Sequence, residues 1–343
     1  MRNGKFLASI WQRLLAFLVI IVSIAAIIVL IKHKRPDKPV AVTERAVIGV
    51  SREPLSALVM IAQENGYFLK NGLDMTVKYY EGGHVAISGM FEGKSNFSTG
   101  ADNMVVFNSL KRHDFSVIAT IATSDNDQRI VGRKDRGILR PDDLRGKGVA
   151  MVKGTGGHYF LYLLLLKHGM SEDDIHLSLK DPTDAFKALI DGDMDAISIR
   201  EPYVTQAVEA LGDNAIVFEE PRLMVKNYDI VATNAFLNKR PEAVKKMLKA
   251  LIQAEEFAAN NQQQAVSIVA KRLGLETTVV ARLLSEMRLK VFLEQSMLTR
   301  FEDIAQWMIK DKIVNTTEMP NYIELIHIDS LLSVKPEAVT VIR

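Results

Sequence analysis

The chain has 343 residues, 48% of them hydrophobic, and a formal charge of +2 with acidic and basic residues interspersed. This length and apolar content suffice for two moderate cores, and the lack of a sustained basic stripe argues against a nucleic-acid partner. The sequence contains no cysteine, which excludes disulfides, thiolate nucleophiles, zinc–cysteine sites and a lipid attached to an N-terminal cysteine.

The first predicted element is an apolar segment near the N-terminus. Residues 14–31 carry no charge and only one polar residue, Ser23. A run of this length just spans a bilayer, and the basic residues that follow it are not typical of a signal-peptide cleavage site. We therefore predict one transmembrane helix, an uncleaved signal anchor at 14–31, between a basic segment at 1–13 and a linker at 32–45. Basic residues on both sides leave its orientation open.

An internal repetition follows the linker. A strand, a loop, a helix and further matching units begin at Val47 and begin again near Val149. The turn at Glu81 corresponds to the turn at Asp181, and Gly93 corresponds to Gly192. We predict an α/β protein with two doubly wound lobes and a cleft between them. Lobe 1 comprises 46–125 and 226–343, and lobe 2 comprises 126–225. The alternative is that any doubly wound protein repeats strand, loop and helix.

The pattern changes at Pro241 to amphipathic helices. Helical spacing of apolar residues, for example at Val244, Met247 and Leu248, predicts helices at 243–260, 262–273, 277–289 and 300–310. We expect these helices to pack on lobe 1.

The loops between strands and helices are the expected binding site. In open α/β sheets ligands sit beyond the carboxyl ends of the strands, and helix N-termini there attract anions. The glycine-rich loop 153-KGTGGHYF-160 lies at such a place but matches neither a nucleotide P-loop nor a dinucleotide fingerprint. It is interpreted as a small-anion site, with a plain tight turn as the alternative. His158 in this loop is more typical of a structural hydrogen-bonding group.

The loop 198-SIREPY-203 presents Arg200, Glu201 and Tyr203 within four positions. These side chains could clamp an anion, pair with an amine or enclose an organic body. The alternative is a surface ion pair between Arg200 and Glu201, with Tyr203 covering the core. The corresponding loop of lobe 1 offers Thr99, Asp102 and Asn103.

Motifs for catalysis and for metal binding are missing from the sequence. The acidic residues at 191–195 lack the glycine and glutamate of a calcium loop, and no Gly-x-Ser-x-Gly elbow is present. We therefore predict a binding protein that is not an enzyme, with no cofactor and no metal. The polar segment 124–128 lies at the expected crossing between the lobes and is interpreted as a hinge, with the edge of the pocket as the alternative.

Four segments resemble the substrate-binding proteins of ABC transporters for sulfonates, taurine, nitrate and bicarbonate. They are 141-PDDLRGKGVAMVKGTGGHYFL-161, 184-DAFKALIDGDMDAI-197, 200-REPY-203 and 301-FEDIAQWMI-309. The resemblance covers about 47–336 and implies the type II periplasmic-binding-protein fold. It further implies two crossings between the lobes, closure on a ligand, and delivery to a permease and its ATPase.

The resemblance also implies where the ligand is bound. The positions carried over are Ser51, Arg52, Gly82, Gly83, Thr99, Gly100, Asp102, Asn103, Thr155, Gly156, Gly157, His158, Arg200, Glu201 and Tyr203. Two features depart from the family pattern. Arg200 replaces an aromatic residue, which favours a more anionic solute, and a transmembrane anchor is present where secreted members are free or lipid-anchored.

The expected function is that of a membrane-anchored solute-binding protein of an ABC importer, facing the periplasm or exterior of the cytoplasmic membrane. Its ligand is expected to be a small oxyanion or organosulfonate, and Asp102 and Glu201 leave a zwitterion such as taurine open. One alternative is a sensory or interaction protein without transport. Another is a binding protein for a pyrimidine precursor of the thiamine pathway; the related synthase is excluded because its cysteine cluster is missing here.

Overall fold

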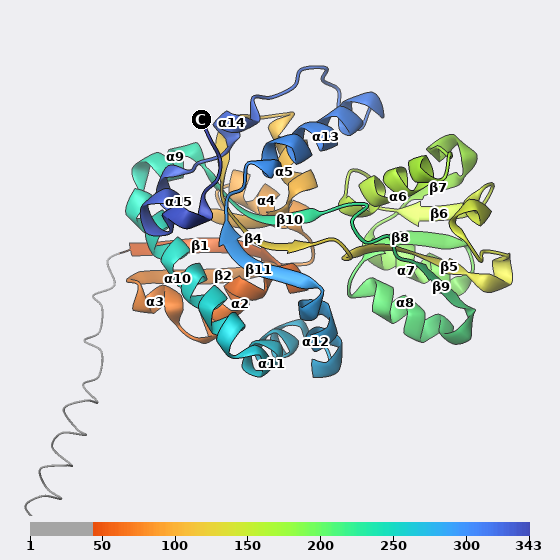
Figure 1. Ribbon diagram of the computed structural model, residues 1–343, viewed down its shortest axis with the longest axis horizontal. Helices are drawn as coiled ribbons and strands as arrows, with labels where there is room; N and C mark the ends of the chain where they lie inside the picture. Colours follow the sequence, from red (N-terminus) through yellow and green to blue (C-terminus); the bar gives the residue numbers. More distant parts are fainter. Residues whose placement is uncertain (1–43) are drawn as a thin grey trace, which may run out of the picture. The chain divides into compact units, whose positions relative to one another are not determined.

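The computed structural model describes residues 44–343, and within this range two β-sheets are each flanked by helices (Figure 1). The predicted signal anchor at 14–31 and almost all of the linker at 32–45 lie outside the described residues. Among residues 44–343, no helix combines the length and the apolar character that a membrane crossing requires.

Lobe 1 consists of the six-stranded sheet and the helices around it. Its strand order is β11-β4-β10-β3-β1-β2. The strands are β1 (Glu44–Ser51), β2 (Leu73–Tyr80), β3 (Phe97–Ala101), β4 (Phe115–Ser124), β10 (Lys226–Thr233) and β11 (Met287–Phe292). The helices are α2 (Ala57–Glu64), α3 (Tyr67–Lys70), α4 (Gly83–Phe91), α5 (Asp102–Ser109), α9 (Asn234–Lys239), α10 (Pro241–Asn260), α11 (Gln262–Leu273), α12 (Thr277–Ser285), α13 (Ser296–Lys310), α14 (Tyr322–Leu325) and α15 (Asp329–Val334).

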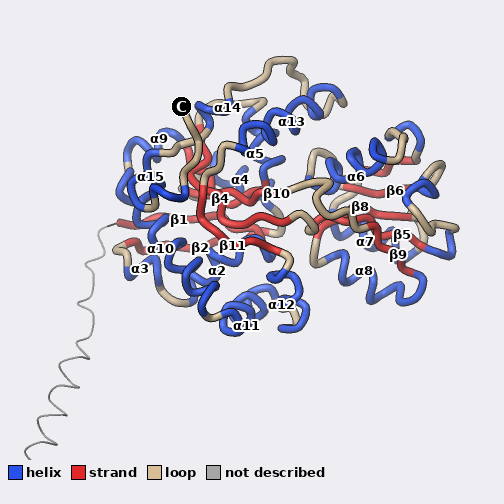
Figure 2. The backbone as a smooth tube through the Cα atoms, viewed as in Figure 1, coloured by secondary structure: helices blue, strands red, loops and turns tan. Residues whose placement is uncertain are grey.

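Lobe 2 consists of the five-stranded sheet and its helices (Figure 2). Its strand order is β7-β6-β8-β5-β9. The strands are β5 (Gln128–Arg133), β6 (Gly148–Met151), β7 (His176–Leu179), β8 (Ala196–Arg200) and β9 (Ala215–Phe218). The helices are α6 (Gly156–Lys167), α7 (Pro182–Asp191) and α8 (Tyr203–Leu211).

The repetition seen in the sequence appears as the same strand order in both lobes. The parallel strands β2-β1-β3 of lobe 1 correspond to β7-β6-β8 of lobe 2. In each lobe the next strand, β10 or β5, is antiparallel because it enters the sheet from a crossing between the lobes. The sheets are therefore mixed, which the prediction of doubly wound lobes did not include.

Two crossings connect the lobes. One runs from the end of β4 at Ser124 to the start of β5 at Gln128, and the other from Phe218 to Lys226. Away from the crossings, Trp307 of α13 packs on Tyr159 of α6, with ring centroids 4.8 Å apart. The predicted helix at 277–289 ends earlier, at Ser285, because the chain from Met287 pairs with the edge of β4.

The central strand β10 buries polar side chains. Asp229 is completely buried and accepts a hydrogen bond of 2.6 Å from Thr120 Oγ1. Burial raises the pKa of Asp229 to about 8. The folded protein therefore keeps this carboxyl group protonated at neutral pH.

Replacing Asp229 by asparagine is expected to reduce the pH dependence of stability. An unfolded aspartate releases its proton near pH 3.9, whereas the folded protein holds it to about pH 8. The stabilisation from this group is thus complete below about pH 4 and is lost as pH rises to 8, by up to about 1.4 kcal/mol per pH unit. Urea unfolding of Asp229→Asn between about pH 5 and 8 should give a flatter curve that exceeds wild type at the alkaline end. Parallel curves would contradict the expectation.

Candidate functional site

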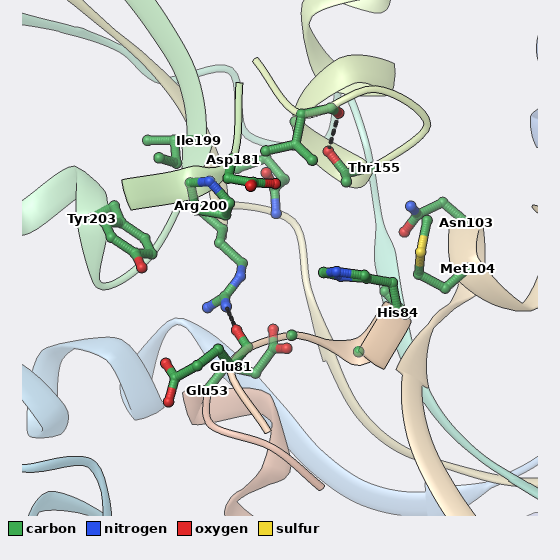
Figure 3. Close-up of a pocket in the computed structure, with 18 of the residues that line it drawn as sticks. Glu53, Glu81, His84, Asn103, Met104, Thr155, Asp181, Ile199, Arg200 and Tyr203 are labelled. Carbon is green, nitrogen blue, oxygen red and sulfur yellow. Dashed lines mark hydrogen bonds between the residues drawn. The ribbon is translucent and has the colours of Figure 1, made fainter. Parts of the chain in front are cut away.

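A cavity of about 320 Å³ lies between the two lobes, at the carboxyl ends of strands (Figure 3). Lobe 1 contributes the segment before α4 and the first turn of α5. Lobe 2 contributes the loop before α6, the turn before α7 and the end of β8. From the positions carried over by resemblance, the cavity lining contains Gly82, Gly83, Asn103, Thr155, Gly156, Gly157, Arg200 and Tyr203.

The remaining carried-over positions do not line the cavity, and all of them except Arg52 are buried. Ser51, Thr99 and Asp102 form hydrogen bonds within lobe 1: the Ser51 backbone N–H donates to Thr99 Oγ1 at 3.0 Å. Asp102 accepts backbone N–H groups of Asn103 and Asn227 at 2.8 and 3.0 Å. These side chains hold loops in place and do not reach the cavity.

His158 also has structural partners. Its Nδ1 accepts the backbone N–H of Gly154 at 3.0 Å, and its Nε2 lies 2.7 Å from Glu172 Oε1. This agrees with the structural interpretation of that residue. Gly100 packs against α4, where a Cβ would lie 2.4 Å from Ile87 Cδ1, and Arg52 lies at the surface, 3.8 Å from Glu81.

Glu201 is buried, so the alternative of a surface ion pair with Arg200 is wrong. Its carboxylate contacts Arg129 Nη1 at 3.3 Å and accepts the Thr205 hydroxyl at 2.8 Å. Arg200 itself donates to the backbone carbonyl of Glu201 and, across the cleft, to that of Glu81, at 2.9 and 3.2 Å. Figure 3 shows Arg200 extending from lobe 2 toward lobe 1.

The floor of the cavity consists of charged side chains that sequence reasoning missed. Lys226 is 3% exposed, and its Nζ donates to Asp127 Oδ2 at 2.5 Å and lies 3.6 Å from Glu53 Oε2. Glu53 Oε1 accepts the hydroxyl groups of Ser51 and Tyr228 at 2.6 and 2.8 Å. The other oxygen, Oε2, has no hydrogen-bond partner among the described residues.

The charge state of this floor follows from its neighbours. Burial alone would raise the pKa of Glu53. The nearby Arg200 and Lys226 and two hydroxyl donors have a larger, opposite effect, and together they lower the pKa to about 2. Burial lowers the pKa of Lys226, yet Asp127 and Glu53 raise it above its ordinary value overall. The floor is therefore a carboxylate beside an ammonium group, both ionised.

Helix N-termini complete the site. α4 begins at Gly83 and α6 at Gly156, and both glycines line the cavity. The unpaired N–H groups of such termini favour a bound anionic group. Gly157 permits this arrangement because a Cβ there would lie 2.8 Å from the Ser198 carbonyl oxygen of β8.

Comparison with known proteins identifies the family. The NMT1/THI5-like family model matches residues 53–265, more than half of the chain. The chain belongs to this family.

Individual relatives of this NMT1/THI5-like protein have names that refer to binding. A protein of Brucella abortus named as a binding protein is 27% identical over 230 residues, covering 64% of this chain and 69% of its own. A Bacillus subtilis protein named for binding aliphatic sulfonates is 25% identical over 274 residues, covering 78% and 82%. These relatives confirm the predicted resemblance.

The fold is shared with a solved structure, the alkanesulfonate-binding protein of Xanthomonas axonopodis pv. citri bound to MOPS. Its TM-score is 0.70 at 18% identity, and the match covers 81% of this chain and 96% of that protein. The likeness establishes the two-sheet periplasmic-binding-protein fold for the described part of the chain.

Proposed function

We propose that the protein is an extracytoplasmic solute-binding protein whose ligand is a small organic molecule with both an acidic group and a protonated nitrogen. This proposal rests on the ionised carboxylate of Glu53, a residue that lines the cavity. Its Oε2 lies 3.6 Å from Lys226 Nζ and has no hydrogen-bond partner among the described residues. The sulfonate-binding names of relatives support the acidic group. We further propose delivery to an ABC permease and attachment to the cytoplasmic membrane through residues 14–31.

The size and the charge of the cavity favour an organic zwitterion over a bare oxyanion. A volume of about 320 Å³ lies at the lower end of small-molecule sites, and nitrate or bicarbonate would fill only part of it. Arg200 and the N-termini of α4 and α6 suit a sulfonate or carboxylate. Glu53 and Asp181, which also lines the cavity, would repel a second anionic group but suit an ammonium group.

Two ligands of matched size test this proposal. Taurine and 1-propanesulfonate differ by an ammonium group in place of a methyl group. We expect calorimetry on the full chain to show tighter binding of taurine. Glu53→Gln should weaken taurine binding by about 1.5–3 kcal/mol, the contribution of a hydrogen bond to a charged group, and leave 1-propanesulfonate unchanged or tighter. Glu242→Gln, on the exposed side of α10, is the matched control.

The remaining outcomes are also informative. Equal binding of both sulfonates, unaffected by Glu53→Gln, would indicate a receptor for anions alone. A thermal-shift panel that adds MOPS, nitrate, bicarbonate and a hydroxymethylpyrimidine covers the other ligand classes. Binding is detectable in this way because a ligand at a hundred times its Kd adds about 2.7 kcal/mol to the free energy of unfolding. No change in Tm with any of these ligands would favour a sensory or interaction protein without transport.

A further inference from the structure

A cluster of charged side chains joins the two lobes beside the crossings, outside the ligand cavity. Arg129 and Glu201 come from lobe 2, whereas Arg282 of α12 and Glu286, which follows this helix, come from lobe 1. We call these four residues the inter-lobe network. Arg129 is 4% exposed and Glu201 is 1% exposed, so the lobe 2 half of the network is buried.

The contacts of the network run across the boundary between the lobes. Arg129 Nη2 donates to Glu286 Oε2 at 2.7 Å, and Arg282 Nη2 contacts Glu201 Oε1 at 3.4 Å. Arg282 also donates to Thr205 Oγ1 of α8 at 2.8 Å. Each lobe 2 residue of the network therefore has a charged partner in lobe 1.

The network also contacts the first crossing. Asn126 Nδ2 donates to Glu286 Oε2 at 3.2 Å, and Ser124 Oγ contacts the backbone carbonyl of Glu286 at 3.5 Å. The side chain of Glu286 thus contacts both the connection that must bend when the lobes move and the first strand of lobe 2. A change in the angle between the lobes would separate these groups.

The network is linked to the ligand cavity through Glu201. Arg200, which lines the cavity, precedes it in the chain and donates to its backbone carbonyl. The Glu201 carboxylate accepts the backbone N–H and the hydroxyl of Thr205 at 3.1 and 2.8 Å. Fixing this carboxylate therefore fixes the backbone from which Arg200 extends.

Arg129 and Glu201 also pair with each other at 3.3 Å within lobe 2. Loss of a lobe 1 partner is unfavourable because it removes a charged contact from this buried pair. The network thus favours the arrangement of lobes in which all four charges are paired. We propose that Arg282 and Glu286 are positioning residues: they hold the lobes at this angle and hold Arg200 at the ligand, although neither lines the cavity. The part of this inference that concerns ligand affinity rests on the proposed function, and the part that concerns the lobe angle does not.

The distance between the lobes can be measured directly because the chain has no cysteine. Lys187 on α7 and Lys249 on α10 are exposed and belong to different lobes. Spin labels on Lys187→Cys and Lys249→Cys in the full chain report the inter-lobe distance by pulsed electron resonance, without any ligand. We expect Glu286→Gln and Arg282→Met each to shift the distance distribution to longer values or to broaden it.

A matched control is available in the same part of lobe 1. Arg288 and Glu294 form a surface ion pair at 2.8 Å that does not involve lobe 2. Glu294→Gln should leave the distance distribution unchanged. Arg282 is partly exposed, 41% by side chain, so Arg282→Met keeps the test valid if Glu286→Gln does not fold.

Ligand binding supplies the second readout. Taurine should bind about tenfold more weakly to both network variants, a magnitude typical of coupling between separate sites. Unchanged distances in both variants, or the same shift in the Glu294→Gln control, would overturn the inference. If wild type binds neither taurine nor 1-propanesulfonate, the proposed function fails, but the distances still decide whether the network sets the lobe angle.

Discussion

Lys226→Met is expected to lower the free energy of unfolding by about 3–5 kcal/mol. The ammonium group of Lys226 lies between the carboxylates of Asp127 and Glu53, and all three side chains are buried. Methionine fills a similar volume but takes the ammonium group away from two buried carboxylates, with Arg200 as the remaining cation near Glu53. Urea unfolding of the full chain measures the loss, which should also appear as a fall in Tm of several degrees.

A second substitution separates the charge effect from lost packing. Combining Lys226→Met with Asp127→Asn removes one carboxylate and should recover much of the loss, because neighbouring charges are not additive in their effects. Lys249→Met on the exposed face of α10 is the control and should change stability by less than about 0.5 kcal/mol. If Lys226→Met lowered the free energy of unfolding no more than this control does, the charged group of Lys226, Asp127 and Glu53 would contribute little to stability.

Arg200→Met is expected to weaken taurine binding about a hundredfold, or about 2–3 kcal/mol. The guanidinium group lines the cavity and bridges to the lobe 1 loop at Glu81. Its loss removes both a cation for the acidic group of the ligand and a contact between the lobes. Calorimetric titration gives the affinity, and circular dichroism shows whether the fold is retained.

The control for this variant is an arginine of the same lobe that does not line the cavity. Arg140 is 72% exposed by side chain and lies 3.7 Å from the carboxylates of both Asp142 and Asp143. Arg140→Met should bind taurine like wild type. Normal taurine binding by Arg200→Met would assign the acidic group of the ligand to other donors, such as the N-termini of α4 and α6.

Features encoded by neighbouring residues were predictable from the sequence. Gly156 and Gly157 lie where β6 gives way to α6, and local spacing indicated an anion site in this loop. Gly82 and Gly83, before and at the start of α4, were carried over from the resemblance, and all four glycines line the cavity. The repeated strand order also left a visible repetition of turns and glycines. The resemblance to binding proteins rested on such local segments.

Features that depend on distant partners were not predictable in this way. Glu53, Asp127 and Lys226 come from three separate segments, and only the folded chain brings their charges within reach of one another. Glu201 has the sequence context of a ligand residue, but Arg129 and Arg282 occupy its carboxylate. No sequence pattern links these distant positions. The sequence alone therefore could not show whether a charged residue such as Glu201 pairs with another buried side chain or contacts a ligand.

The position of β10 has a consequence for the order in which the chain folds. β10 lies between β3 and β4 in the sheet of lobe 1, yet all of lobe 2 is synthesised between β4 and β10. Until Lys226–Thr233 emerges from the ribosome, β3 and β4 each have an unpaired edge, and such edges favour aggregation. Loop-closure entropy depends only weakly on the length of an insertion, so a compact, already folded lobe 2 would bring the ends together at a modest cost. Nascent chains should therefore complete lobe 2 first, and lobe 1 should acquire protease resistance only after β10 has been translated.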